Sequence, residues 1–150
     1  MGPTWNELFM QVADLVSKKS TCIRKQVGAV LVHDNRIISI GYNGTPAGMR
    51  HCCDHFKNAD TTAPDFMDEH RKFSAFRELH GEQNALAFAC KNGLETDGCT
   101  MYVTLSPCSA CAKSILAAGI KKVYYKEKYD RETNGIDFLI EAGISCEQIN

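Results

Sequence analysis

Apolar positions along the chain change period several times, and each change predicts an element of secondary structure. Between Trp5 and Ser17 they recur at helical spacing, and Thr4 begins a capping box, so we expect a helix there. Two runs follow in which β-forming residues dominate, Gln26–His33 and Arg36–Tyr42. Asp34-Asn35 separates them, and this pattern predicts a β-hairpin.

Residues 44–72 begin as a Gly/Pro-rich loop and then lose any clean period, so we expect an irregular insertion with one short helix. Beyond it, helices are expected over Glu82–Lys91, Pro107–Ala118 and Gly135–Ala142, and strands over Thr100–Leu105, Lys121–Lys126 and Ile144–Ile149. Strands joined through helices run parallel. The pattern therefore predicts one α/β domain over residues 1–150, a mixed five-stranded sheet with helices on both faces in three α-β-α layers.

Composition narrows the classes of partner and location. The formal net charge of −1 argues against nucleic acid as a partner, because nucleic-acid binders usually carry a basic face. There is no apolar run of membrane-spanning length, and residues 1–19 do not resemble a signal peptide, so we expect a cytoplasmic protein that does not enter a membrane. In that reducing compartment the eight cysteines are expected to be metal ligands or buried thiols rather than disulfides.

The strongest chemical pattern is His80-Gly81-Glu82 followed by a Pro-Cys-x-x-Cys motif at residues 107–111. Both stand where a helix is expected to begin, and helix N-termini favour the thiolate form of cysteine. His80, Cys108 and Cys111 would supply three ligands and leave a fourth position open. That is the coordination of a catalytic zinc ion, since structural zinc sites are closed by four protein ligands.

Glu82 lies two residues past the histidine, where a carboxylate can move protons for the metal centre. The H-x-E…P-C-x-x-C pattern is the signature of zinc-dependent nucleobase deaminases, in which zinc activates a water molecule. The alternative is a structural zinc site in which Glu82 only caps its helix.

Four stretches together resemble the bacterial and bacteriophage deoxycytidylate (dCMP) deaminases: Gly41–Gly48, His80–Ala85, Met101–Cys108 and Ala118–Val123. The resemblance extends roughly from Trp5 to Ile144. It implies the cytidine-deaminase-like three-layer fold and the hydrolysis of dCMP to dUMP and ammonia, with zinc as the cofactor.

The resemblance also implies substrate-binding residues. Arg24 is the first choice for the phosphate, because guanidinium matches phosphate geometry; the alternative is a solvated surface arginine. Asn43 would bind the sugar or base, or is simply a turn residue. Ser106 and Tyr129 would lie near the nucleotide, although Tyr129 could equally be a packing residue.

Matching the phage members of the family position by position gives a second, structural zinc ion. Its ligands would be Cys22, Cys52, His70 and Glu78. Three neighbours rival them as ligands: His51, Cys53 and His55. The alternative is that the cysteines are only small buried apolar residues.

Members of the family are typically hexamers that dCTP activates and dTTP inhibits. By resemblance, Gly44 and Gly48 would hold an effector triphosphate with Mg²⁺, and Asn84 and Lys91 would form the neighbouring wall. The alternative for the glycine-rich loop is a plain turn.

Two rival functions stay open. The first is a related zinc deaminase that acts on a tRNA adenosine or on cytosine, although the near-neutral charge favours a free nucleotide over tRNA. The second is a zinc-stapled binding module without activity, which the open three-ligand arrangement disfavours.

Overall fold

The computed structural model describes residues 1–150. Its strands are β1 (Gly28–His33), β2 (Arg36–Tyr42), β3 (Thr100–Leu105), β4 (Lys122–Glu127) and β5 (Ser145–Gln148). Its helices are α1 (Trp5–Ser17), α2 (Cys52–His55), α3 (Phe66–Arg77), α4 (Gly81–Lys91), α5 (Ser109–Ala117) and α6 (Asn134–Glu141). None of the helices has both the length and the apolar character needed to cross a membrane.

The five strands form one mixed sheet in the order β2-β1-β3-β4-β5. The β1–β2 hairpin turns through Asp34 and Asn35, which have φ of 48° and 57°, as a two-residue turn between twisted strands requires. β1 is antiparallel to β2 and β3, whereas β3, β4 and β5 are mutually parallel. The prediction that the strands after the hairpin run parallel is confirmed.

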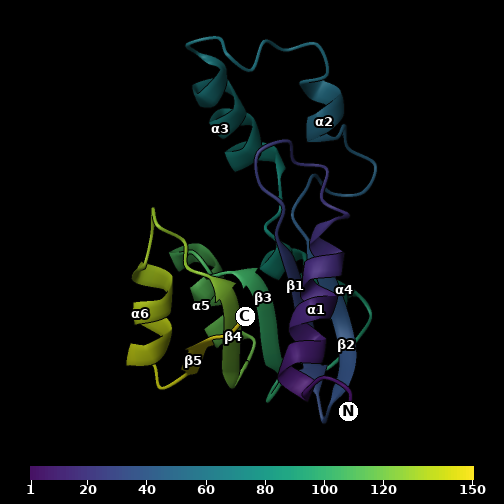
Figure 1. Cartoon of the computed structure of the whole chain (residues 1–150), viewed down its shortest axis with the longest axis vertical. Coiled ribbons are helices and arrows are strands. Elements are labelled where there is room, and N and C mark those ends of the chain that lie inside the picture. The colour runs from purple at the N-terminus through teal and green to yellow at the C-terminus, as the bar shows by residue number, and fades with distance from the viewer.

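Helices cover both faces of the sheet, which confirms the predicted α-β-α layering (Figure 1). Side chains alternate along a strand, so β1 sends Ala29 and Leu31 to one face and Val30 and Val32 to the other. The first pair packs with α4, α5 and α6, and the second pair packs with α1.

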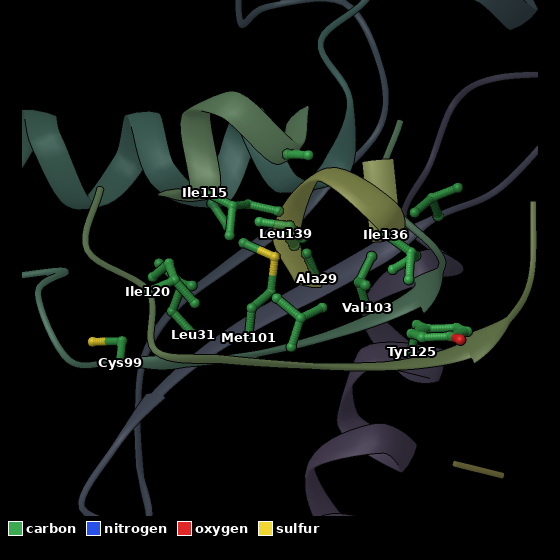
Figure 2. Close-up of a cluster of buried hydrophobic side chains, with 14 of the residues drawn as sticks. Ala29, Leu31, Cys99, Met101, Val103, Ile115, Ile120, Tyr125, Ile136 and Leu139 are labelled. Atoms are coloured by element: carbon green, nitrogen blue, oxygen red, sulfur yellow. The ribbon is translucent and has the colours of Figure 1, made fainter. Parts of the chain in front are cut away.

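The larger core lies under α4, α5 and α6 (Figure 2). There Met101 and Val103 of β3 pack with Ile115 of α5 and Leu139 of α6, all fully buried. This packing fixes α5 directly after the carboxyl end of β3. The Pro-Cys-x-x-Cys turn is therefore held at one edge of the sheet.

The insertion projects beyond that edge as α2 and α3, at the top of Figure 1. It is more ordered than expected, because α3 is a 12-residue helix that continues past Lys72 to Arg77. Its buried residues Phe66, His70 and Phe73 follow helical spacing, but a buried histidine interrupts the apolar pattern and hides the period. The insertion has a small core of its own: Cys22, Cys52, Phe56, Phe66 and Phe73.

Candidate metal centres and the cleft between them

A cleft of about 1110 Å³ opens between the insertion and the edge of the sheet. His80, Glu82 and Cys108 lie on one wall, and the other carries residues of the second predicted metal cluster. Small-molecule sites in proteins usually measure about 300–1,000 Å³, so the cleft has room for a nucleotide.

His80, Cys108 and Cys111 converge as the first candidate metal centre, with their ligand atoms within 4.8 Å of one another. His80 Nδ1 lies 3.2 Å from Cys111 Sγ and 3.5 Å from Cys108 Sγ. A tetrahedral zinc ion with ordinary bond lengths separates a nitrogen and a sulfur ligand by about 3.6 Å. The three side chains therefore already stand at the spacing that zinc requires.

The electrostatics of this centre favour a thiolate. Hydrogen bonds from Cys111 and from His80 lower the pKa of Cys108 to about 4. The same hydrogen bond to Cys108 is the main cause that raises the pKa of His80. Because Cys108 is the N-cap residue of α5, the helix N-terminus adds to the stabilisation of negative charge there.

Glu82 lies in the first turn of α4, beside His80, and is only 4% exposed. Burial raises the pKa of its carboxyl above the ordinary value, against the opposing effects of its own backbone N–H and of His80. A carboxyl group with a raised pKa holds a proton more readily near neutral pH, which suits a group that must both accept and donate one.

Two glycines let the helices of this centre approach their supports closely. A Cβ on Gly41 of β2 would lie 2.3 Å from the backbone nitrogen of Ala85 in α4. A Cβ on Gly135 of α6 would lie 2.1 Å from the carbonyl oxygen of Pro107, next to the first cysteine ligand. Close backbone contacts thus position α4 and the start of α5, which carry the ligands, and a side chain at either glycine would prevent these contacts.

The loop between β4 and α6 is fastened to the cysteine turn by two hydrogen bonds. The backbone N–H of Tyr129 donates to Ser106 Oγ at 2.7 Å. The backbone N–H of Ser109 donates to Glu132 Oε1 at 2.8 Å, so a carboxylate from this loop caps α5. Neither contact was expected from the sequence, because each joins residues 23 positions apart.

Cys22, Cys52, His70 and Glu78 form the second candidate metal centre, with four ligand atoms within 4.8 Å of one another. His70 Nε2 lies 3.6 Å from Cys22 Sγ and 3.5 Å from Cys52 Sγ, again the spacing of a tetrahedral zinc site.

The rival ligands lie outside this cluster. Cys53 and His51 are exposed, and the ring of His55 stacks on Phe73 at 4.5 Å.

A zinc ion suits the donors of the second centre. Glu78 Oε1 is buried without a hydrogen-bond partner, while its other oxygen accepts from Ser74. Burial raises the pKa of Cys52 to about 12 and raises that of Cys22 as well. A metal ion would satisfy the unpartnered carboxylate oxygen and, as metal binding generally does, displace the thiol protons.

The cleft also gathers the residues predicted to touch substrate: Arg24, Asn43, Ser106 and Tyr129. Asn43 uses its amide on backbone groups, accepting from Val27 N and donating to Lys25 O, each at 2.8 Å.

Four further basic residues of the same cleft were not predicted: Lys18, Lys25, Arg71 and Arg131. Lys25 Nζ lies 5.5 Å from the ring centroid of Tyr129. The basic pair Arg24-Lys25 was the available sequence signal for Lys25. Nothing local distinguishes Arg131 from other surface arginines.

The residues predicted for an effector site are only partly brought together. Asn84 Nδ2 donates to Tyr42 O at 2.9 Å, which places the start of α4 beside the glycine-rich loop. Gly44 pairs with Leu79 in an isolated bridge, and Gly48 has a positive φ of 87° at the loop tip. Lys91 lies seven residues beyond Asn84, about 10 Å along the helix, so it is separated from this contact by two turns.

Comparison with known proteins agrees with this geometry. Residues 3–127 match the family described as the cytidine and deoxycytidylate deaminase zinc-binding region. The deoxycytidylate deaminase of Enterobacteria phage T4 is 40% identical over 163 aligned positions, covering 90% of this chain and 84% of the phage protein. ComE operon protein 2 of Bacillus subtilis is 40% identical over 146 positions, covering 97% of this chain and 71% of that protein.

Solved structures give the same result. The crystal structure of dCMP deaminase from the cyanophage S-TIM5 in complex with dCMP and dUMP superposes with a TM-score of 0.80 at 39% identity, covering 99% of each chain. The family match and the relatives span nearly all the elements that build the cleft. This chain therefore belongs to the cytidine and deoxycytidylate deaminase zinc-binding family.

Proposed function

We propose that this protein hydrolyses dCMP to dUMP and ammonia at the His80–Cys108–Cys111 centre. The observation that carries the proposal is the buried carboxyl of Glu82 beside three convergent zinc ligands in a nucleotide-sized cleft. The phage T4 relative is a deoxycytidylate deaminase, and the cyanophage relative was solved with dCMP and dUMP, which supports this substrate.

The proposed chemistry assigns a proton path to Glu82. Zinc, when bound, supplies the Lewis acid that makes a water molecule nucleophilic at neutral pH. The Glu82 carboxylate takes a proton from that water and delivers it to the ring nitrogen beside the attacked carbon. Glu82 then takes the second proton of that water, from the hydroxyl now on the attacked carbon, and passes it to the departing amine, so one water is consumed and one ammonia is released.

For the substrate phosphate we propose Arg24, assisted by two of the other basic residues that line its cleft, Lys25 and Arg131. Ser106 accepts from Tyr129 N and keeps its O–H free to donate to the nucleotide. We propose that Asn43 holds the backbone of the cleft wall through one bond at each end of its amide and binds the sugar or base with its second N–H.

We also propose a structural zinc ion at Cys22, Cys52, His70 and Glu78, supported by their spacing and by the unpartnered Glu78 oxygen. None of the eight cysteines forms a disulfide, which supports a cytoplasmic location for the protein.

Regulation is a separate proposal: a homo-oligomer, with a hexamer expected, activated by dCTP and inhibited by dTTP. An effector triphosphate with Mg²⁺ would bind at Gly44 and Gly48, with Asn84 and Lys91 alongside. Phe88 shares the stripe of α4 that holds Asn84 and Lys91 and is 49% exposed, which supports a subunit contact there. Rate curves for dCMP with each triphosphate test this, since dCTP should lower the apparent KM and dTTP should raise it.

One assay separates the proposed activity from its rivals. The protein is incubated with dCMP, cytosine, deoxycytidine and adenosine, and ammonia release is followed. Release from dCMP far above the other three supports the proposal. Preference for cytosine or adenosine would show that the protein is a deaminase of a different substrate. No ammonia release from any of the four compounds would favour a zinc-stapled binding module without activity.

A further inference from the structure

The segment Ser20–Val27, which we call the arm, connects the two candidate metal centres. It lies between α1 and β1 and is neither helix nor strand. Cys22 belongs to the second centre, whereas Arg24 and Lys25 line the cleft that also holds His80. A predicted metal ligand and the proposed phosphate-binding residues are therefore only two and three positions apart.

Side-chain hydrogen bonds hold the two ends of the arm. Ser20 Oγ donates to Asn43 O at 2.8 Å, and the Asn43 amide holds Lys25 O and Val27 N. The middle of the arm lies against the second centre instead. The backbone N–H of Cys53 donates to Thr21 O at 3.1 Å, and Cys22 Sγ lies 3.6 Å from His70 Nε2.

A bound metal ion would hold this part of the arm more firmly. It would join Cys22 to Cys52, His70 and Glu78 through coordination bonds, in place of the weaker contacts between their side chains. Binding of a divalent cation converts both cysteines to thiolates and releases two protons, so the formal charge of the cluster does not change. An effect of the metal on phosphate binding must therefore arise from the position of the arm rather than from added positive charge.

We propose that the metal ion at the Cys22–Cys52–His70–Glu78 centre positions Arg24 and Lys25 for the substrate phosphate, so that its loss selectively weakens binding of nucleoside 5′-monophosphates. The inference rests on the proposed function, because it takes the phosphate of dCMP and dUMP as the group that Arg24 and Lys25 bind.

The catalytic centre is separated from this effect. Glu78 and His80 are two residues apart, but Leu79 between them pairs with Gly44 through two backbone hydrogen bonds of 2.8 and 3.1 Å. This bridge holds His80 independently of Glu78. Loss of the second metal should therefore leave the first metal and the binding of the base and sugar intact.

The test compares Cys52→Ser with Cys53→Ser, an adjacent and exposed cysteine outside the cluster. Zinc per chain is measured by elemental analysis, and dUMP and deoxyuridine affinities by calorimetry. We expect C53S to keep two zinc ions and wild-type affinities. We expect C52S to keep one zinc ion and to bind dUMP at least about tenfold more weakly, with deoxyuridine affinity unchanged, because charge-assisted contacts to phosphate are lost. Equal dUMP affinity in the two variants, or equal weakening of both ligands, overturns the proposal.

A second experiment needs no substitution and covers the case in which C52S does not fold. Coupling is reciprocal, so the phosphate must in turn stabilise the second metal. The rate of zinc loss from the wild-type protein to a chelator is followed with saturating dUMP or with saturating deoxyuridine. dUMP should protect both ions, and deoxyuridine only one. Equal protection by the two ligands overturns the positioning role.

The proposed deaminase activity and the positioning role of the second metal are refuted by different results. Absence of ammonia release from dCMP by the wild-type protein refutes the activity itself. Release from dCMP together with zinc-independent dUMP affinity refutes only the positioning role of the second metal.

Discussion

Asn43 is the side chain on which the wall of the cleft most directly depends. It is 9% exposed, and its amide bonds Val27 N and Lys25 O at 2.8 Å each. Asn43→Ala leaves the buried N–H of Val27 and the partly buried carbonyl of Lys25 without partners, and a buried group left so costs about 1–3 kcal/mol. The cleft beside them admits water, so the lower end of that range, about 1–1.5 kcal/mol for each group, applies and we expect a loss of about 2–3 kcal/mol in the free energy of unfolding.

The assay is urea and thermal unfolding with saturating zinc, so that metal loss does not distort the comparison. For a chain of this length each kcal/mol lowers Tm by about 2–4 °C, so the expected drop is about 4–12 °C. Asn92→Ala is the matched control, because Asn92 makes a single exposed hydrogen bond to Phe88 O. A loss in Asn43→Ala no larger than in the control would refute the assignment of its amide to the backbone.

Three further predictions test the catalytic centre and the core. Glu82→Gln should keep zinc and stability but lower kcat by at least about 10²–10⁴-fold, the usual share of general acid–base catalysis; wild-type turnover would show that another group moves the proton. Gly135→Ala should destabilise the protein by about 1–3 kcal/mol and weaken zinc retention against a chelator, since its Cβ would lie 2.1 Å from Pro107 O. Unchanged values of both would show that α6 does not set the cysteine turn. Burial raises the pKa of Tyr102 from 10.0 to about 12, so the neutral hydroxyl stabilises the fold below pH 10 and that contribution is lost as pH rises towards 12. Urea unfolding at pH 8 and 11 should show a smaller alkaline loss in Tyr102→Phe than in the wild type, and identical losses would contradict the reasoning.

Much of the fold followed from local patterns. Thr4 and Glu7 form the expected capping box, with Glu7 N donating to Thr4 Oγ1 and Thr4 N donating to Glu7 Oε2. The hairpin and the alternation of later strands with helices predicted the mixed sheet correctly. One short helix was expected in the insertion, but the length of α3 was not, because its buried face includes His70, whose burial serves the second cluster rather than an apolar core.

The candidate site also has parts that the sequence predicted and parts that it did not. The spacing of His80, Glu82, Cys108 and Cys111 identified one cluster from the sequence, because motif residues on helix starts have a nearly fixed local geometry. The hydrogen bond from Ser109 N to the Glu132 carboxylate could not be predicted, since it depends on how the β4–α6 loop folds back over the cysteine turn.

The sequence by itself determined the order of elements and the two motifs that supply the three-ligand centre and its acid, because each motif is encoded by residues close together in the chain. The resemblance named Cys22, Cys52, His70 and Glu78 but left rivals open, and the tertiary structure decided among them by placing Cys52 in the second cluster and leaving the adjacent Cys53 exposed. It also brought that cluster and the proposed phosphate-binding residues onto one cleft. The physical reason is that these contacts join segments far apart in sequence, whose distances are fixed by packing of the helices on the sheet and not by any local preference.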